Sequence, residues 1–213
     1  MAKKGIVPTK SKLLALEREL SLAKQGHELL EQKRQILVME LMRIVGRAEE
    51  VERRADESLA KAYRAMSLTF ATMGKSRVKS MAQAVSINPS LSTQNRSIMG
   101  AIVPAIRLAL NDQPPYFAHG GASLWTDEAV ESFKEALQRL TELAELKTTA
   151  LRLAREVSKT LRRVNALEKV SIPDHIESIS YIRSVLEESE RERFGSMKLI
   201  KARLGAERGG EAS

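Results

Sequence analysis

Residues 13–55 read LLALERELSLAKQGHELLEQKRQILVMELMRIVGRAEEVERRA, and the architecture of the chain depends on this stretch. Apolar or small side chains recur along it in alternating steps of three and four residues. Such steps average 3.5 residues, which keeps an apolar stripe on one side of a supercoiled helix. A stripe of this length needs an apolar partner, because it would otherwise face water. Its positions are Leu13, Leu16, Leu20, Ala23, Leu30, Leu37, Leu41, Ile44, Ala48, Val51 and Ala55, with His27 and Arg34 as polar members.

The stripe belongs to a first long helix within residues 1–73. Pro8 prevents the helix from extending backwards, and either Thr9 or Ser11 can cap its first turn. We therefore expect a helix from about Thr9 to about Met73. At 1.5 Å per residue it would be roughly 95 Å long, far longer than a helix in a compact domain.

Residues 74–125 have a different character. The periodic stripe disappears, and charged residues become rare. Short apolar stretches at 84–87 and 98–106 look more like strands or loops than like a long helix. We expect a small β-hairpin with irregular chain, inserted between two helices. The helix-breaking residues of this segment are Pro89, Pro104, Pro114, Pro115, Gly120 and Gly121.

A second long helix is predicted over residues 126–204, with Thr126 as its N-cap. Pro173 removes one backbone hydrogen bond and should bend this helix locally. The polar, glycine-rich residues 205–213 are expected to be disordered. The apolar positions of the helix are Val130, Phe133, Leu137, Leu140, Leu143, Leu146, Ala150, Leu153, Val157, Leu161, Val164, Leu167, Ile176, Ile179, Ile182 and Leu186.

The simplest arrangement pairs the two helices with each other in antiparallel orientation. The predicted fold class is therefore all-α: a long antiparallel two-helix coiled coil with a small β-hairpin or irregular insertion. Both termini would lie at one tip, which would be electropositive. The cations assigned to this tip are Lys3, Lys4, Lys10, Lys12, Lys198, Lys201 and Arg203.

Composition narrows the functional classes. The net charge is +8, aromatic residues make up 4% of the chain, and there are no cysteines. Lys and Arg are interspersed with acids except near the termini, and aromatics are too few to stack on bases, so we expect no nucleic acid partner. We also expect no membrane insertion, because no apolar run approaches the length of a transmembrane helix. The absence of cysteine suits a reducing cytoplasm.

Motifs that would carry chemistry are incomplete. Gly74-Lys75-Ser76 matches the end of a phosphate-binding loop, but Thr69 stands where that loop needs a glycine. His119-Gly120-Gly121 resembles an oxyanion loop without an accompanying serine elbow. His27 is better explained as a polar position that sets helix register than as a metal ligand. We therefore expect no cofactor, no metal and no catalytic residue in this chain.

Several segments resemble the D subunit of the V-type and archaeal A-type rotary ATPases. The start of the first helix carries Pro8-Thr9-Lys10-Ser11 followed by Leu13, and the insertion carries Met99-Gly100 followed by Val103-Pro104. The most specific match is in the second helix. It comprises Arg162-Arg163-Val164-Asn165-Ala166-Leu167-Glu168, Ile172-Pro173, Ile179, Tyr181-Ile182, Leu186, Glu188, Glu190-Arg191-Glu192 and Phe194. The resemblance spans roughly residues 6–204, and Gly195-Ser196 depart from the pattern expected after the Phe.

The resemblance implies a rotor shaft that transmits torque between a catalytic ring and an ion-translocating membrane sector. The paired terminal helices would insert into a ring of catalytic and nucleotide-binding subunits (the A and B subunits). The other end would join the small F subunit and a funnel-shaped adaptor on the membrane rotor, at the cytoplasmic face of the membrane. ATP would be hydrolysed in the ring and not in the shaft. The segment 84–110 would be a lower hairpin, near the F subunit or free to tune turnover.

The candidate ring-binding residues fall into two groups. At the tip they are Lys10, Lys12, Lys198, Lys201 and Arg203, and in mid-shaft they are Arg162, Arg163 and Asn165. A bend near Pro173 would give the shaft an asymmetric surface for the ring sites. The competing hypothesis is a non-rotary coiled-coil adaptor or scaffold protein, which composition and periodicity alone do not distinguish from a shaft.

Overall fold

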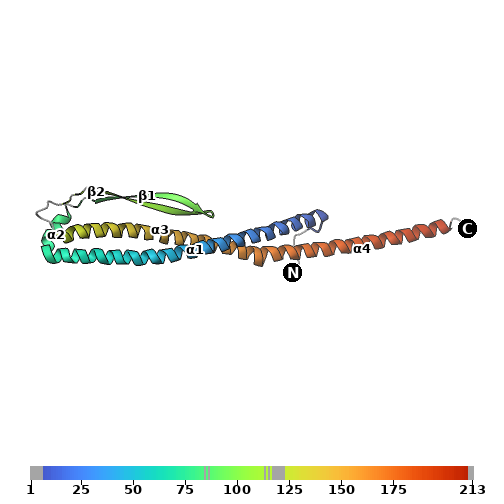
Figure 1. Ribbon diagram of the computed structural model, residues 1–213. Helices are drawn as coiled ribbons and strands as arrows, with labels where there is room; N and C mark the ends of the chain where they lie inside the picture. The colour runs from blue at the N-terminus through green and yellow to red at the C-terminus, as the bar shows by residue number, and fades with distance from the viewer. Residues whose placement is uncertain are drawn as a thin grey trace. The chain divides into compact units, whose positions relative to one another are not determined.

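The computed structural model describes residues 7–83, 85, 87–112, 114, 116 and 123–210, with the side chains of 112 and 202–210 left undescribed. The elements follow the order α1 (Lys10–Met73), α2 (Lys75–Ala82), β1 (Ile87–Ile98), β2 (Ala101–Asp112), α3 (Leu124–Ala166), η1 (Leu167–Ser171) and α4 (Ile172–Gly210). The chain divides into two compact units, one of residues 33–159 and one of residues 1–32 with 160–213. The predicted all-α class with a hairpin insertion is confirmed (Figure 1).

Helix α1 has the predicted bounds for local reasons. The backbone N–H of Lys12 donates to Oγ1 of Thr9 at 3.2 Å, so Thr9 is the N-cap. Gly74, just past the helix, has φ +77°, a left-handed conformation that a residue with a Cβ adopts at a cost. The cap and this glycine fix the two ends of the helix.

In the unit of residues 33–159, α1 packs antiparallel against α3. Leu37 and Leu153 are fully buried, and Ile44 and Leu146 lie in the same apolar cluster. The ammonium of Lys147 contacts Glu52 across the pair at 2.6 Å. The part of the predicted α1 stripe from Leu37 to Ala55 therefore lies in the core of this unit.

The first turns of α3 differ from the prediction. Small residues Ala129, Ser132 and Ala136 are buried there, whereas Leu137 and Leu140 remain 37% and 38% exposed. Small side chains at a contact between two helices allow the helix axes to approach each other, and larger residues next to them then lie at the side of the contact. Thr126 is not the N-cap either, because α3 begins at Leu124.

The insertion contains both the expected hairpin and a helix that the sequence did not indicate, α2. Strands β1 and β2 pair antiparallel in register Ile98 with Ala101 through Ile87 with Asp112. Their turn is Met99-Gly100, inside the stretch 98–106 that we expected to form a strand or a loop. Ala101 and Val103 belong to the core of the helix pair, so the hairpin lies alongside α1 and α3 (Figure 1).

In the other unit, the start of α1 packs against α4 in antiparallel orientation. Leu16, Ile179 and Ile182 form its buried cluster. The guanidinium of Arg183 donates to Glu17 at 2.8 Å. Helix α4 extends to Gly210 and so includes residues 205–210, which we expected to be disordered: a helix that has already formed adds further residues without a new nucleation cost. Residues 211–213 of the expected tail lie outside the described residues.

Candidate partner-binding surfaces

The cations expected at one tip lie at different levels of their unit. Lys10 begins α1, and its ammonium contacts the carboxylate of Glu190 on α4 at 2.7 Å. This hydrogen bond, together with the charge of Lys10, holds the pKa of Glu190 below its usual value. Lys12 is exposed beside it. Lys10 therefore already has an intramolecular partner.

Helix α4 continues past this level (Figure 1). Lys198 and Lys201 are exposed, and Lys198 lies eight residues beyond Glu190, about 12 Å at the helical rise. The structure thus spreads these cations along one helix and does not gather them with Lys10. Arg203 lies in α4, but its side chain is outside the described residues.

The same stretch of α4 exposes large apolar side chains that sequence reasoning missed as candidates. Phe194 is 69% exposed, Met197 64%, Leu199 68% and Ile200 57%. The stripe of α4 ends at Leu186, because α1 begins at Lys10 and offers no described helix farther along. The sequence shows that apolar residues continue past Leu186, but only the start of α1 at Lys10 shows that α1 does not cover them.

The mid-helix candidates lie just before an irregularity in the helix. Arg162 and Arg163 are exposed, and Asn165 is half-buried beside the buried Val164. The π-helical η1 follows at once. All three candidates thus lie within one turn of each other on the surface of α3.

Pro173 explains the π-helical turn. The N–H of Ile172 donates to the carbonyl of Leu167, five residues back. In an unbroken α-helix the proline ring would collide with the carbonyl of Lys169 and leave it without a donor. The wider turn accommodates the ring. We predicted a local bend at Pro173; the structure shows a π-helical segment that precedes the proline.

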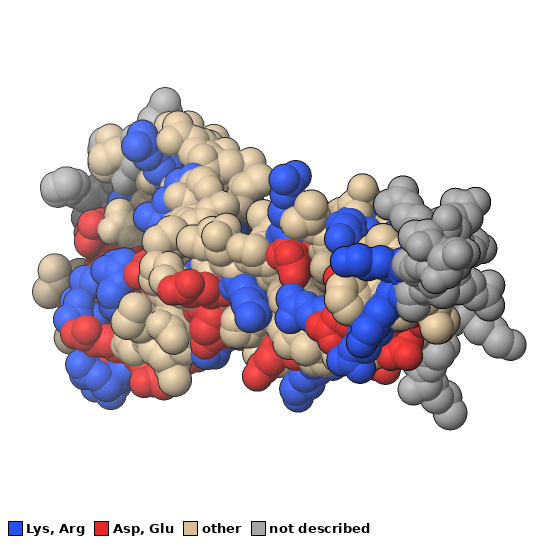
Figure 2. Space-filling model, turned by 90° about the vertical axis from the view of Figure 1, so that its right-hand side faces the viewer, with Lys and Arg blue, Asp and Glu red and all other residues tan. Residues whose placement is uncertain are grey.

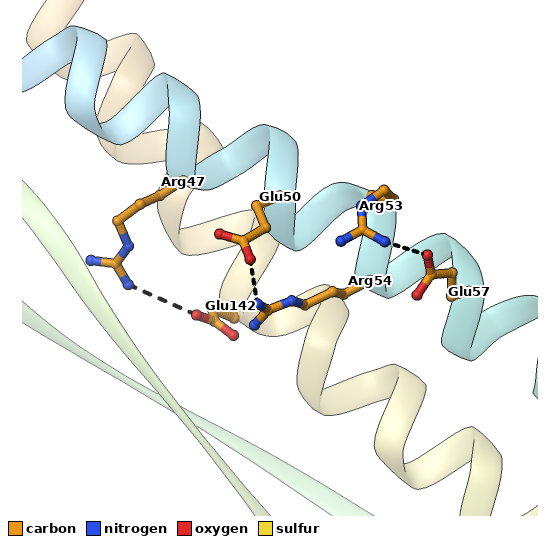
Figure 3. Close-up of polar contacts among 6 residues, drawn as sticks. All are labelled: Arg47, Glu50, Arg53, Arg54, Glu57 and Glu142. Atoms are coloured by element: carbon orange, nitrogen blue, oxygen red, sulfur yellow. Dashed lines mark hydrogen bonds and ion pairs between the residues drawn. The ribbon is translucent and has the colours of Figure 1, made fainter.

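In the unit of residues 33–159, exposed ion pairs cover the helices. Arg47 of α1 lies 4.0 Å from Glu142 of α3, and Arg53 contacts Glu57 at 2.6 Å (Figure 3). Such exposed pairs contribute little free energy. Figure 2 shows basic and acidic side chains next to one another and not in separate fields. This mixture does not favour a nucleic acid surface.

The chemical motifs gain no support from the geometry. Gly74-Lys75-Ser76 leads into the short helix α2 without a preceding strand. The ring nitrogen Nδ1 of His175 lies 4.0 Å from a carboxylate oxygen of Glu19, and His119 lies outside the described residues. In the described part of the chain, no group of three or more His, Asp or Glu side chains could hold a metal ion.

Among the helices in the described part of the chain, none combines the length and the apolar character needed to cross a membrane.

The chain is similar to the proteins of one known family. Residues 12–202 match the family described as the D subunit of ATP synthase. The chain is 37% identical to the A-type ATP synthase D subunit of Thermococcus sibiricus, over 94% of this chain and 95% of that protein. It is 36% identical to the protein of the same name from Methanosarcina acetivorans, over 96% and 99%. The corresponding Pyrococcus furiosus protein is 37% identical, over 94% and 95%.

Proposed function

The chain belongs to the family of ATP synthase D subunits, and on this premise we propose that it is the central rotor shaft of a V/A-type ATPase or ATP synthase. It transmits torque between the catalytic ring and ion translocation in the membrane sector. It contributes no catalytic residue itself. Its place is the cytoplasmic face of the membrane, peripheral to it, within the complex.

The distribution of apolar side chains on the end of α4 carries this proposal. At about 100° per residue, Met197, Leu199 and Ile200 lie about 300°, 140° and 240° around the helix from Phe194. All four are more than half exposed. A helix that is apolar on several sides is normally surrounded by protein. A ring of subunits supplies such a surrounding surface, whereas a partner that docks on one face does not.

The polar candidates serve the same ring. Lys198 and Lys201 interleave with the apolar side chains, and Arg162 and Arg163 lie farther back, in the last turns of α3. Arginine donates in a planar fork that matches carboxylates. We assign these cations, with Lys10, Lys12, Asn165 and Arg203, to contacts with the A and B subunits of the ring. The insertion side of the chain joins the F subunit and the funnel-shaped adaptor.

The competing adaptor function predicts a helical protein that binds partners without an ATPase. The family match favours the rotor over this alternative.

Affinity purification of the tagged chain from its native cells, with ATPase activity measured on the eluate, tests the proposal. We expect two large nucleotide-binding subunits, a small partner and ATPase activity. Phe194→Glu should lower the recovered activity at least about tenfold, as for an interface hot spot. Leu151→Glu is the matched control, since Leu151 is 63% exposed on α3. Wild-type eluates without ATPase subunits would refute the rotor function, and equal losses in both variants would refute the role of α4.

A further inference from the structure

The hairpin has two outer edges, and the turn determines which backbone groups face them. Met99 and Gly100 have φ +49° and +82°, the signs of a type I′ turn. In such a two-residue turn the flanking pair, Ile98 and Ala101, exchanges both hydrogen bonds. Hydrogen-bonded and non-hydrogen-bonded residue pairs then alternate along the two strands. It follows that Ser97, Asn95, Thr93 and Leu91 turn their backbone N–H and C=O groups away from β2.

The corresponding edge of β2 is occupied by α3. The carbonyl of Ile102 accepts from Nη1 of Arg152 at 3.1 Å, and the N–H of Ile106 donates to Oε2 of Glu145 at 2.8 Å. Pro104, between them, has no N–H to satisfy. These contacts confirm that even-numbered positions of β2 face outward. They also leave this edge closed to a further strand.

The edge of β1 carries no such protection. Residues 88–97 are exposed along the whole strand. In the described part of the chain, nothing donates to or accepts from the outward backbone groups of Leu91, Thr93, Asn95 or Ser97. Proteins usually blunt a free edge with lysines, prolines, bulges or a covering element. Here only Pro89, near one end, serves that purpose, and four successive outward positions stay available.

We propose that the free edge of β1 binds an extended, carboxylate-bearing segment of another subunit of the complex as a third strand of the sheet. The backbone groups spaced two residues apart match only a strand. Charge defines the partner's side chains: Arg96 and Arg107 lie on the same face by the register, and the only acid of the hairpin is Asp112 at its base. The side chain of Arg96 stays 51% exposed, although its guanidinium lies 3.8 Å from Glu145 of α3. Opposite charges on neighbouring strands stabilise their pairing.

A second copy of this chain is a poorer occupant. It would set two acid-free β1 strands, each with its own Arg96, against each other. The proposed strand addition rests on the proposed function, because it takes its partner from the ATPase complex.

Residue-resolved amide hydrogen exchange, on the free full-length chain and on the purified complex, tests this inference. In the free chain the amides of β1 should alternate, with the even-numbered ones protected by β2 and those of Leu91, Thr93, Asn95 and Ser97 exchanging freely. Assembly should slow these four at least about tenfold and leave the even-numbered ones protected.

Thr93→Pro provides the decisive variant, because it removes an outward donor without removing a hydrogen bond to β2. It should abolish the protection gained by Leu91 and Asn95 on assembly, while Thr93→Val should keep it. Protection of the even-numbered amides in both variants shows that the hairpin is folded.

An active complex whose outward amides exchange as in the free chain would overturn the strand addition and leave the rotor function standing. Protection that rises with the concentration of the free chain would assign the edge to a second copy and overturn the chosen occupant. Failure to assemble with any ATPase subunit would overturn both proposals.

Discussion

Two leucines two residues apart on α3 allow the core to be tested with a matched control. Leu153 is fully buried in the cluster that contains Leu37 and Leu146, whereas Leu151 is 63% exposed on the same helix. Leu153→Ala removes apolar groups whose transfer from water is worth about 2 kcal/mol. The cavity left against the neighbouring leucines raises the cost to about 3–4 kcal/mol. Leu151→Ala should change the free energy of unfolding by less than about 0.5 kcal/mol.

Urea titration followed by circular dichroism measures both free energies, and thermal melts give a second estimate. For a chain of this length, Leu153→Ala should lower Tm by about 6–16 °C, and the urea m-value should stay constant. The Tm of Leu151→Ala should equal that of the wild type. Equal shifts for the two variants, or a loss below about 1 kcal/mol for Leu153→Ala, would refute the assignment of the predicted stripe as the buried core.

Three further predictions concern single residues. Lys10→Ala should return the pKa of Glu190 toward its usual value, as a carboxyl NMR titration would measure. Because this pKa is lowered in the folded chain, the contact with Lys10 stabilises the fold above the unfolded-state pKa of Glu190. That stabilisation is lost as the pH falls through the folded-state pKa. An unchanged titration would contradict the contact. Gly100→Ala should cost about 1 kcal/mol, because it forces a Cβ into φ +82°, and should speed exchange of the hairpin amides about fivefold; exchange at the wild-type rate would argue against the type I′ turn. Pro173→Ala restores an N–H donor to the carbonyl of Lys169, so η1 should become α-helical, which backbone NMR chemical shifts would show. The coupling of ATP hydrolysis to rotation in the complex should fall. Unchanged rate and torque would remove any role of this turn in rotation.

Local signals predicted the long helices well. Thr9 has both the side chain and the position to cap α1, and the steps of three and four residues identified Leu37, Ile44 and Val51 as buried. These features depend on residues within a few turns of each other. They can therefore be inferred from the order of the amino acids.

Other features depend on contacts between residues distant in the chain. The spacing of apolar residues placed Leu137, and not Ala136, in the predicted stripe, yet the helix pair buries the alanine and leaves the leucine 37% exposed. The candidate surface on α4 was missed for a similar reason. Phe194 and Met197 become candidates only once α1 is known to begin level with Glu190 and leave them uncovered.

The amino-acid order was enough to predict two long amphipathic helices, their antiparallel pairing around a hairpin insertion, and the resemblance to a rotor protein, because helical periodicity and short motifs are local properties. Three-dimensional packing was needed to learn which apolar side chains are buried, how far α4 extends beyond its partner, and which edge of the hairpin α3 covers. Those outcomes depend on the register between segments more than 30 residues apart, such as Ile106 with Glu145, and no local pattern encodes that register.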